Sequence, residues 1–307
     1  MNIDNAVKRY LKELAVLNRS KGTIKSVRSA LGHLRRFLQD QRIETIEHLT
    51  SEVLADYQQE LYFTLTAKAA PLAVGTQIRL LCAARGFTRF LHNKDYLAAD
   101  PGKAIELPKM VKRLPKAILS QQEIKTLLSA CDMQSCIGYR RRLIIEILYD
   151  TGIRRGELTG LKLIDIDLGA GYLHVTGKGG KDRVVPVSGR VCQLMHNYLL
   201  FIRPTFIQGR DPGHLILNQY GHPMAGNGIY TEVRQAVEQA GIKKKITTHS
   251  LRHTCATHML RNGAPIRHIQ EMLGHESLES TQIYTRVTIN DLKQIHAKYH
   301  PSEKSTF

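Results

Sequence analysis

A proline-containing basic stretch near the middle of the chain most constrains how this sequence can fold. Residues 107–119 read LPKMVKRLPKAIL, with two prolines, four basic residues and no acidic residue. Proline removes a backbone donor and ends a helix, so helical periodicity cannot run through this stretch. With 307 residues available, the sequence predicts two domains, at 1–107 and 120–290, joined by a linker at 108–119 and followed by a tail at 291–307.

The first domain is predicted to be all-helical. Within residues 23–43, one apolar stripe recurs at helical spacing, formed by Val27, Leu31, Leu34 and Leu38. A second stripe within residues 76–93 is predicted to face inward, formed by Ile78, Leu81, Cys82 and Phe90.

Basic residues accompany both of these predicted helices. Those of the first are Lys25, Arg28, Arg35 and Arg36, and those of the second are Arg79, Arg85 and Arg89. Each set taken singly is equally consistent with a solvated face. Four of them are our candidate DNA contacts in this domain: Lys25, Arg28, Arg79 and Arg85.

The second domain is predicted to be α+β, with helices around a small three-stranded antiparallel sheet. Ser120 and Glu123 form a capping-box pattern that predicts a helix from Gln121. Short β-branched runs separated by glycine-rich turns predict strands at 163–168, 172–176 and 182–187. The other predicted helices are 141–149, 155–161, 228–240, 250–262, 265–273, 277–284 and 290–299.

Charge and composition indicate the class of partner. The formal net charge is +17 and the sequence pI is about 9.8, which favours a polyanion such as nucleic acid over a merely basic surface. We see no membrane-spanning run and no signal peptide, so a cytoplasmic protein is expected. The five cysteines are odd in number, scattered and without a CxxC pair, which favours reduced thiols.

The second domain holds side chains suited to phosphoryl transfer without a metal. Arg154 and Arg252 offer forked donors for the oxygens of a phosphodiester. Proton carriers occur at Lys178, His249 and His275, and Tyr284 offers a nucleophile. Because no dense carboxylate cluster accompanies them, we expect no metal and no other cofactor.

Each of these features is weak when taken alone. TGxRxxEL is most often a helix start at which Glu157 pairs across a turn, and GKGGKDR is compatible with a plain flexible hairpin. His249 and His253 have a spacing that can bind zinc, but neither a suitable third ligand nor an HExxH motif is evident. The order and spacing of the whole set carry the argument.

Four stretches of the second domain together resemble the tyrosine recombinase, or phage integrase, family. They are YDTGIRRGELTGL at 149–161, TGKGGKDRVVPV at 176–187, THSLRHTCATHML at 248–260 and LGHESLESTQIYTRV at 273–287. They follow the family order without a large insertion. The first domain resembles the family's core-binding domain more loosely.

The resemblance implies catalytic roles for six residues, namely Arg154, Lys178, His249, Arg252, His275 and Tyr284. It implies a supporting role for Glu157. On the hairpin, Lys178 occupies the family's GKG position, so we prefer it as the proton donor and expect Lys181 to contact phosphate. Arg183 is a further candidate DNA contact.

The chain is most similar to Xer-type recombinases, in its two-domain length and in its tail. The stretch DLKQIHAKYHP at 291–301 resembles the Xer C-terminal helix, which packs on a neighbouring protomer, although docking on its own domain remains the alternative. The resemblance implies double-stranded DNA as partner and a homo-tetramer on it, or a hetero-tetramer with a related recombinase. No membrane or small-molecule substrate is expected.

Three functions are compatible with this sequence. The first is a site-specific recombinase acting through a 3′-phosphotyrosine intermediate and a Holliday junction, in dimer resolution or in mobile-element integration or excision. A type IB-like topoisomerase would use related chemistry without a dedicated site. A non-catalytic DNA-binding accessory protein is opposed by the intact set of catalytic residue types.

Overall fold

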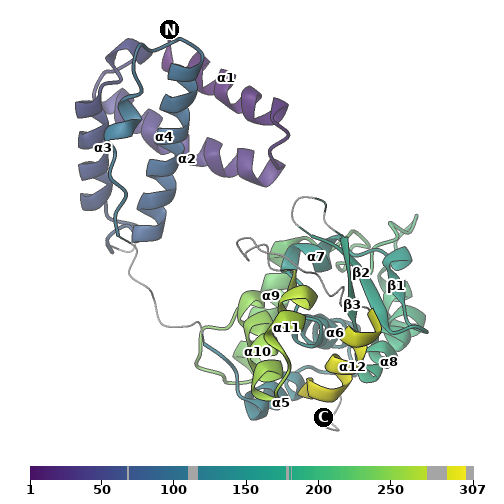
Figure 1. The fold of residues 1–307 in the computed structure, drawn as a ribbon. Helices are drawn as coiled ribbons and strands as arrows, with labels where there is room; N and C mark the ends of the chain where they lie inside the picture. The colour runs from purple at the N-terminus through teal and green to yellow at the C-terminus, as the bar shows by residue number, and fades with distance from the viewer. Residues whose placement is uncertain (68, 110–116, 178–179, 181, 275–288, 302–307) are drawn as a thin grey trace. The chain divides into compact units, whose positions relative to one another are not determined.

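The computed structural model describes residues 1–67, 69–109, 117–177, 180, 182–274 and 289–301. The chain divides into two compact units, Met1–Arg113 and Leu114–Phe307, and Figure 1 shows the elements of each. Part of the predicted linker, residues 110–116, lies outside the described residues. The predicted domain limits therefore stay a prediction.

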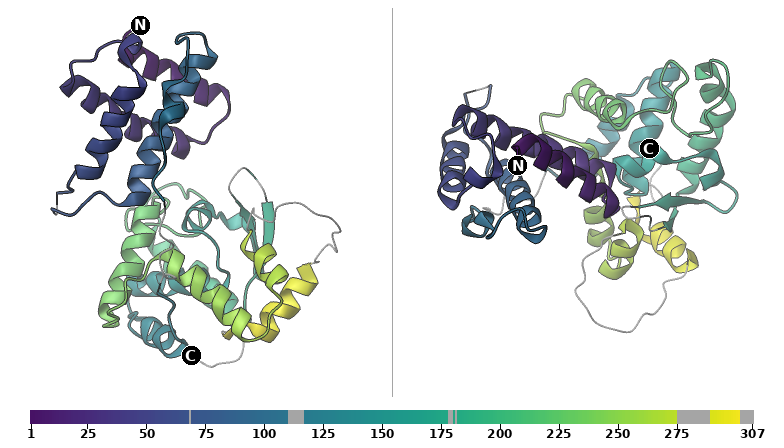
Figure 2. Two further views of the ribbon diagram at one scale, coloured as in Figure 1. Left: turned by 60° about the vertical axis from the view of Figure 1, so that its left-hand side comes forward. Right: turned by 90° about the horizontal axis from the view of Figure 1, so that it is seen from above.

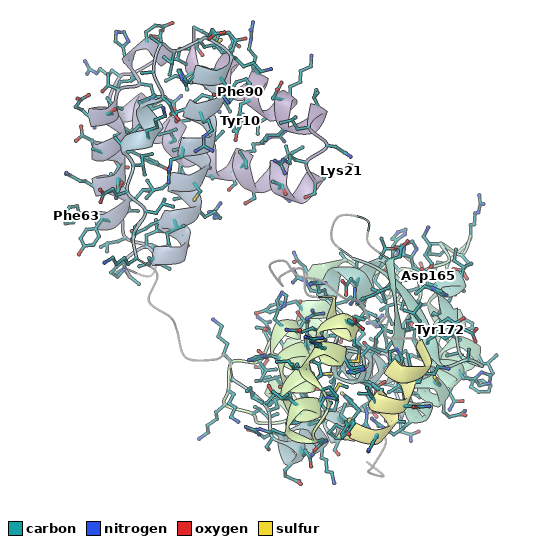
Figure 3. All side chains as sticks on the ribbon, in the orientation of Figure 1. Tyr10, Lys21, Phe63, Phe90, Asp165 and Tyr172 are labelled. Atoms are coloured by element: carbon teal, nitrogen blue, oxygen red, sulfur yellow. The ribbon has the colours of Figure 1, made fainter. Side chains whose placement is uncertain are left out.

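The first unit is a bundle of helices, as the sequence predicts. Its long helices are α1 (Ile3–Val16), α2 (Lys21–Asp40), α3 (Ser51–Phe63) and α4 (Val74–Asn93). Single 3-10 turns follow α2 and α4, at Ile46–His48 and Pro101–Ala104. Tyr10 of α1 packs against Phe90 of α4, and their ring centroids are 5.1 Å apart. Both side chains are labelled in Figure 3.

The predicted apolar stripe of α2 is confirmed. Leu31, Leu34 and Leu38 are buried, and Val27 packs against the same core. The helix begins where the Ser20 hydroxyl accepts a hydrogen bond from the Thr23 amide, an N-cap that satisfies an otherwise unpaired donor.

The predicted stripe of α4 is wrong at one position. Leu81 is fully buried and Ile78 and Phe90 are partly buried, but Cys82 is exposed. The inward face of α4 instead includes Leu80, Leu81, Ala84 and Leu91, all of which are buried. Ala84 lies one turn after Leu80, and Leu91 lies about three turns after Leu81. Cys82 follows Leu81 by a single residue, a rotation of roughly 100° that carries its side chain off this face.

The second unit is built around α6 (Cys136–Asp150), most of whose residues are buried. The helices around it are α5 (Gln121–Ser129), α7 (Arg155–Gly160), α8 (Gly189–Asn197), α9 (Gly226–Gln239), α10 (Thr248–Arg261), α11 (Ile266–Leu273) and α12 (Ile289–Tyr299). The predicted capping box is confirmed, because the Ser120 amide donates to Glu123 and the Glu123 amide donates to the Ser120 hydroxyl. The helix predicted at 277–284 lies outside the described residues.

The three-stranded antiparallel sheet has the order β1-β2-β3. Its strands are β1 (Ile166–Asp167), β2 (Tyr172–Thr176) and β3 (Asp182–Pro186). The predicted bounds of the middle strand are confirmed, whereas the first strand is shorter than predicted. Residues Leu163–Asp165 instead form a 3-10 turn, which the Asp165 carboxylate caps by accepting the Lys162 amide at 2.8 Å.

The C-terminal helix packs on its own unit. Figures 1 and 2 show α12 in yellow beside β3, and α12 also contacts α10 and α11. Ile295 and Tyr299 are partly buried against the main core. Docking on a neighbouring protomer stays a prediction.

Two further findings concern the chain as a whole. The five cysteines, all within the described residues, are free. Among the described helices, none combines the length and apolar character that crossing a membrane requires.

Candidate active site

A sharp turn after α6 places Arg154. Helix α6 ends at Asp150, and Gly152 follows with φ of +62°, a left-handed conformation that favours glycine. A Cβ at this position would lie 2.4 Å from Leu273 Cδ2, so the turn also needs the space that glycine leaves. Arg154 then forms the N-cap of α7.

Glu157 lies beneath Arg154 and binds two arginines. Its carboxylate accepts the Arg154 amide at 2.7 Å and Arg154 Nη1 at 2.9 Å. Arg183 of β3 donates to both carboxylate oxygens, at 3.0 and 2.8 Å. Burial opposes ionisation of Glu157, but the hydrogen bonds from Arg183 and Arg154 outweigh it, so the pKa of this carboxyl is lowered.

Arg252 of α10 lies beside this pair and is buried. Its Nη1 donates to the Gly152 carbonyl and its Nη2 to the Leu273 carbonyl, each at 2.7 Å. Burial, together with the charge of Arg154, lowers the pKa of Arg252 to about 10. The guanidinium therefore stays charged at neutral pH, and the site combines three guanidinium groups with one carboxylate.

All three arginines meet the C-terminal end of α11. The Met272 carbonyl accepts Arg183 Nε at 2.9 Å, the Leu273 carbonyl accepts Arg252 Nη2 at 2.7 Å, and the Gly274 carbonyl accepts Arg154 Nη2 at 2.8 Å. The last carbonyls of a helix lack intrahelical donors and lie at the negative end of its dipole. Three elements far apart in sequence are thereby fixed around the residue that precedes His275.

The structure places some of the predicted catalytic residues and leaves others undescribed. Arg154 and Arg252 come together, and His249 lies exposed in the first turn of α10, three positions before Arg252. Lys178, Lys181, His275 and Tyr284 lie outside the described residues.

The side chain of Arg183, a predicted DNA contact, points into the protein. Its guanidinium points inward to Glu157 and Met272, and 14% of its side chain is exposed. Sequence reasoning missed this supporting position, because nothing in the sequence indicates that residue 183 lies against both 157 and 272. Contact of Arg183 with DNA stays a prediction.

The zinc alternative for His249 and His253 gains no support from the described residues. There, the one group of three or more potential ligands is Asp150, His296 and His300, which includes neither histidine.

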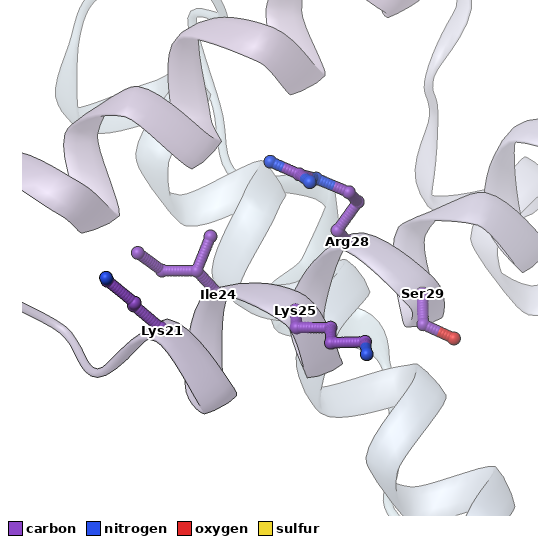
Figure 4. Close-up of a pocket in the computed structure, with 5 residues that line it drawn as sticks. All are labelled: Lys21, Ile24, Lys25, Arg28 and Ser29. Atoms are coloured by element: carbon purple, nitrogen blue, oxygen red, sulfur yellow. The ribbon is translucent and has the colours of Figure 1, made fainter. Parts of the chain in front are cut away.

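In the first unit, two predicted DNA contacts share a pocket. Lys25 and Arg28 line it together with Lys21, Ile24 and Ser29, all on the first turns of α2, as Figure 4 shows. Three of these five side chains are cationic, namely Lys21, Lys25 and Arg28. On α4, Arg79 is exposed and Arg85 is partly exposed.

Comparison with known families covers both units. Residues 117–290 match the phage integrase family, and residues 7–95 match the phage integrase N-terminal SAM-like domain. Among curated proteins, the tyrosine recombinase XerC 2 of Ralstonia nicotianae is 37% identical over 95% of this chain and 84% of its own length. The tyrosine recombinase XerD of Staphylococcus haemolyticus is 33% identical over 97% of this chain and 99% of its own.

Solved structures share the fold. A lambda integrase dimer bound to a COC′ core site has a TM-score of 0.68 at 19% identity, covering 93% of this chain and 81% of that one. The XerH site-specific recombinase in a pre-cleavage complex with its difH substrate has a TM-score of 0.67 at 21% identity, covering 97% and 82%. The mainly helical architecture with its small sheet is therefore shared with these proteins.

Proposed function

This chain belongs to the phage integrase family of tyrosine recombinases, and from that membership we propose that it is a site-specific recombinase that cuts and rejoins duplex DNA. We assign Tyr284 as the nucleophile, which forms a 3′-phosphotyrosine and releases a 5′-hydroxyl. One phosphodiester is exchanged for another, so the reaction balances without a nucleotide or redox cofactor.

The observation that carries this proposal is the convergence of Arg154 and Arg252 at the end of α11. Arg154 donates to Glu157 and to the Gly274 carbonyl, and Arg252 donates to the Gly152 and Leu273 carbonyls. Each arginine uses only part of its guanidinium for these contacts. The remaining N–H groups are available for the two non-bridging oxygens of a phosphodiester. Donors fixed in advance stabilise charge that builds up in the transition state, because they need no reorganisation when the reaction occurs.

The same convergence bears on the nucleophile. A phenol has an unperturbed pKa of about 10, so Tyr284 needs help to attack at neutral pH. The cationic cluster favours the phenolate and neutralises the phosphate under attack. We assign proton acceptance from Tyr284 to His249, a hydrogen bond to the phosphate to His275, and protonation of the departing 5′-oxygen to Lys178.

We further propose that the assembly is a tetramer on DNA, built from this chain alone or together with a related recombinase. The net charge of +17 and the cationic pocket of α2 support DNA as the partner. A solved structure with a similar fold is a lambda integrase tetramer bound to a Holliday junction. In this proposal residues 1–107 form the core-type DNA-binding domain, 120–290 carry out catalysis, and the reaction takes place in the cytoplasm, where the DNA lies.

The test is the Tyr284→Phe variant, which removes one hydroxyl. Binding to the recombination site should stay within a few-fold of the unaltered chain, while covalent protein–DNA complexes on denaturing gels should vanish. Tyr220→Phe is the matched control, since Tyr220 is 61% exposed and lies outside the site. An SDS-resistant adduct formed by the Tyr284→Phe variant would overturn the assignment. Relaxation of any supercoiled plasmid, without a paired site, would favour a topoisomerase.

A further inference from the structure

Two histidines, His296 within α12 and His300 directly after it, contact the end of α6 outside the arginine cluster. His296 Nε2 lies 2.9 Å from the Asp150 carbonyl oxygen, and His300 Nε2 lies 3.1 Å from the Tyr149 carbonyl oxygen. These carbonyls belong to the last turn of α6, where intrahelical donors are missing. The histidines are four residues apart, and their rings stack at 4.7 Å with an interplanar angle of 6°. They therefore act together as a cap on α6.

Asp150 adds a buried negative charge to this contact. Its side chain is fully buried, and Oδ2 accepts the Ser188 amide at 2.9 Å. The other oxygen, Oδ1, has no hydrogen-bond partner among the described residues. It lies 3.6 Å from His296 Nε2 and 3.4 Å from His300 Nδ1. A buried carboxylate costs free energy unless a positive charge faces it, so imidazolium at His296 or His300 would stabilise this arrangement.

Two groups next to Asp150, Tyr149 on α6 and Cys255 on α10, add no charge to this cluster. Burial raises the pKa of Tyr149, whose ring lies 4.9 Å from that of His300, and it raises the pKa of Cys255, whose thiol donates to the Asp150 carbonyl. Both groups are therefore neutral at physiological pH. Burial also lowers the pKa of His258, which contacts the Tyr149 hydroxyl.

Charged groups on the other elements that pack nearby either form ion pairs with other residues or are exposed to solvent. On α8, Arg190 pairs with Glu146. On β3, Arg183 pairs with Glu157 and Asp182 is exposed. The remaining groups, on α11, are the exposed Arg267 and Glu271 and the half-exposed His268. On α10, Arg252 donates to the Gly152 and Leu273 carbonyls. Among the described residues, the groups within 4 Å of Asp150 Oδ1 that can carry a positive charge are the imidazoles of His296 and His300.

A metal ion fits this cluster less well than protons do. The potential ligand atoms of Asp150, His296 and His300 all lie within 4.8 Å of one another. However, both Nε2 atoms lie at hydrogen-bond distance from a carbonyl oxygen, so each must carry a hydrogen. A protonated ring nitrogen has no lone pair for a metal, which leaves His296 Nε2 unavailable as a ligand.

We propose that Asp150, His296 and His300 form a charge-dependent latch that positions the active site. Asp150 precedes Arg154 by four residues, and the intervening Gly152 carbonyl holds Arg252. On the other side of the latch, α12 begins at Ile289, five residues after Tyr284. The latch therefore joins the segment that follows the nucleophile to the turn that places both arginines.

This role rests on the proposed function, and it gives a direction with pH. When an imidazolium loses its proton from Nδ1, the Nε2 hydrogen that is donated to the carbonyl remains. Asp150 then no longer faces a positive charge from that ring. Docking of α12 should therefore weaken as pH rises through the range in which histidines discharge, around pH 6 to 8. Lys293 lies over the Tyr172 ring at 5.6 Å and gives α12 a contact outside the latch.

The first experiment follows α12 in the full chain without DNA. Hydrogen-exchange protection factors, which correct for the intrinsic pH dependence of exchange, are measured for α12 and for α1 as reference between about pH 6 and 8.5. Protection of α12 should fall with rising pH while that of α1 stays constant. The double variant His296→Gln/His300→Gln keeps amide donors but no charge, so its protection should be low and independent of pH. The control, His196→Gln, alters an exposed histidine of α8 and should behave as the unaltered chain does.

The second experiment measures covalent adduct formation at saturating DNA. The double Gln variant and Asp150→Asn should form adduct about 10- to 100-fold more slowly, as expected for a small misplacement of reacting groups, with unchanged half-site affinity. Protection of α12 that is independent of pH in the unaltered chain would overturn the latch. So would a rise in protection on adding zinc chloride that Asp150→Asn abolishes, since the cluster would then be a metal site. If the unaltered chain forms no adduct at all, the proposed function fails while the exchange result stands.

Discussion

At the scale of single residues, Arg183 links Glu157 to the end of α11. It holds both oxygens of Glu157 and the Met272 carbonyl. Glu157 in turn fixes Arg154, and Met272 lies three positions before His275. We predict that Arg183 positions Arg154 and the end of α11.

We expect Arg183→Ala to lower the rate of adduct formation about 10- to 100-fold, because Arg154 and the end of α11 lose a shared anchor. Half-site affinity should change little. Removing one partner of a buried pair should also cost about 1–3 kcal/mol of unfolding free energy. Single-turnover cleavage and urea denaturation measure the two effects. If Arg183 instead contacts DNA, binding will weaken and its salt dependence will decrease, while cleavage at saturating DNA remains normal.

At the scale of elements, the backbone of the turn between α6 and α7 sets the positions of Arg154 and Arg252. Gly152→Ala should destabilise the second unit by about 1–3 kcal/mol, since a left-handed alanine is strained and its Cβ would meet Leu273 Cδ2 at 2.4 Å. Adduct formation should fall as well, because the Gly152 carbonyl orients Arg252.

The matched control lies on the next helix. Gly156 is within α7, and a Cβ there would meet no atom within 4 Å. Gly156→Ala should therefore be neutral or stabilising by about 0.5–1 kcal/mol. Equal destabilisation by both variants in urea titrations would show that the Gly152 turn carries no special constraint.

Sequence alone located most elements whose signal is local. The capping box at Ser120 and the β-branched run of β2 each lie within a few residues, and the structure confirms both. Helix α8 was missed, although Ser188 caps it by accepting the Val191 amide. This short helix follows almost directly on β3, without a glycine-rich turn to separate the two elements. The exposed position of Cys82 was missed because a single stripe does not define how wide the buried face is.

The candidate site divides in the same way. The motif order identified Arg154 and Arg252, whose convergence the structure shows. The contacts of Arg183 with Glu157 and Met272, and of Asp150 with His296 and His300, join segments 26 to 150 residues apart. Such pairs depend on the packing of α6, α10, α11 and α12, and no local pattern encodes that packing.

At the scale of the whole molecule, the charge is distributed over both units. The cationic pocket of α2 and the arginines around α11 each belong to a separate compact body. A duplex held by both would release counterions along its length, so affinity should fall steeply with salt. Within one chain, α12 packs on the second unit. We predict that on DNA the same surface receives the helix of a neighbouring protomer.

Deleting residues 290–307 tests whether α12 packs on its own unit alone or also on a neighbouring protomer. In the free chain α12 packs on its own unit through Ile295, Tyr299 and the latch, so the truncated chain should unfold several degrees lower. Binding to a single half-site should stay largely intact, because the candidate DNA contacts lie elsewhere. If α12 moves to a neighbouring protomer on DNA, cooperative occupancy of paired half-sites should weaken as well, since each interface of the ring loses a contact. Gel-shift titrations on single and paired half-sites measure both effects. Unchanged cooperativity together with a destabilised monomer would show that the helix serves its own unit alone.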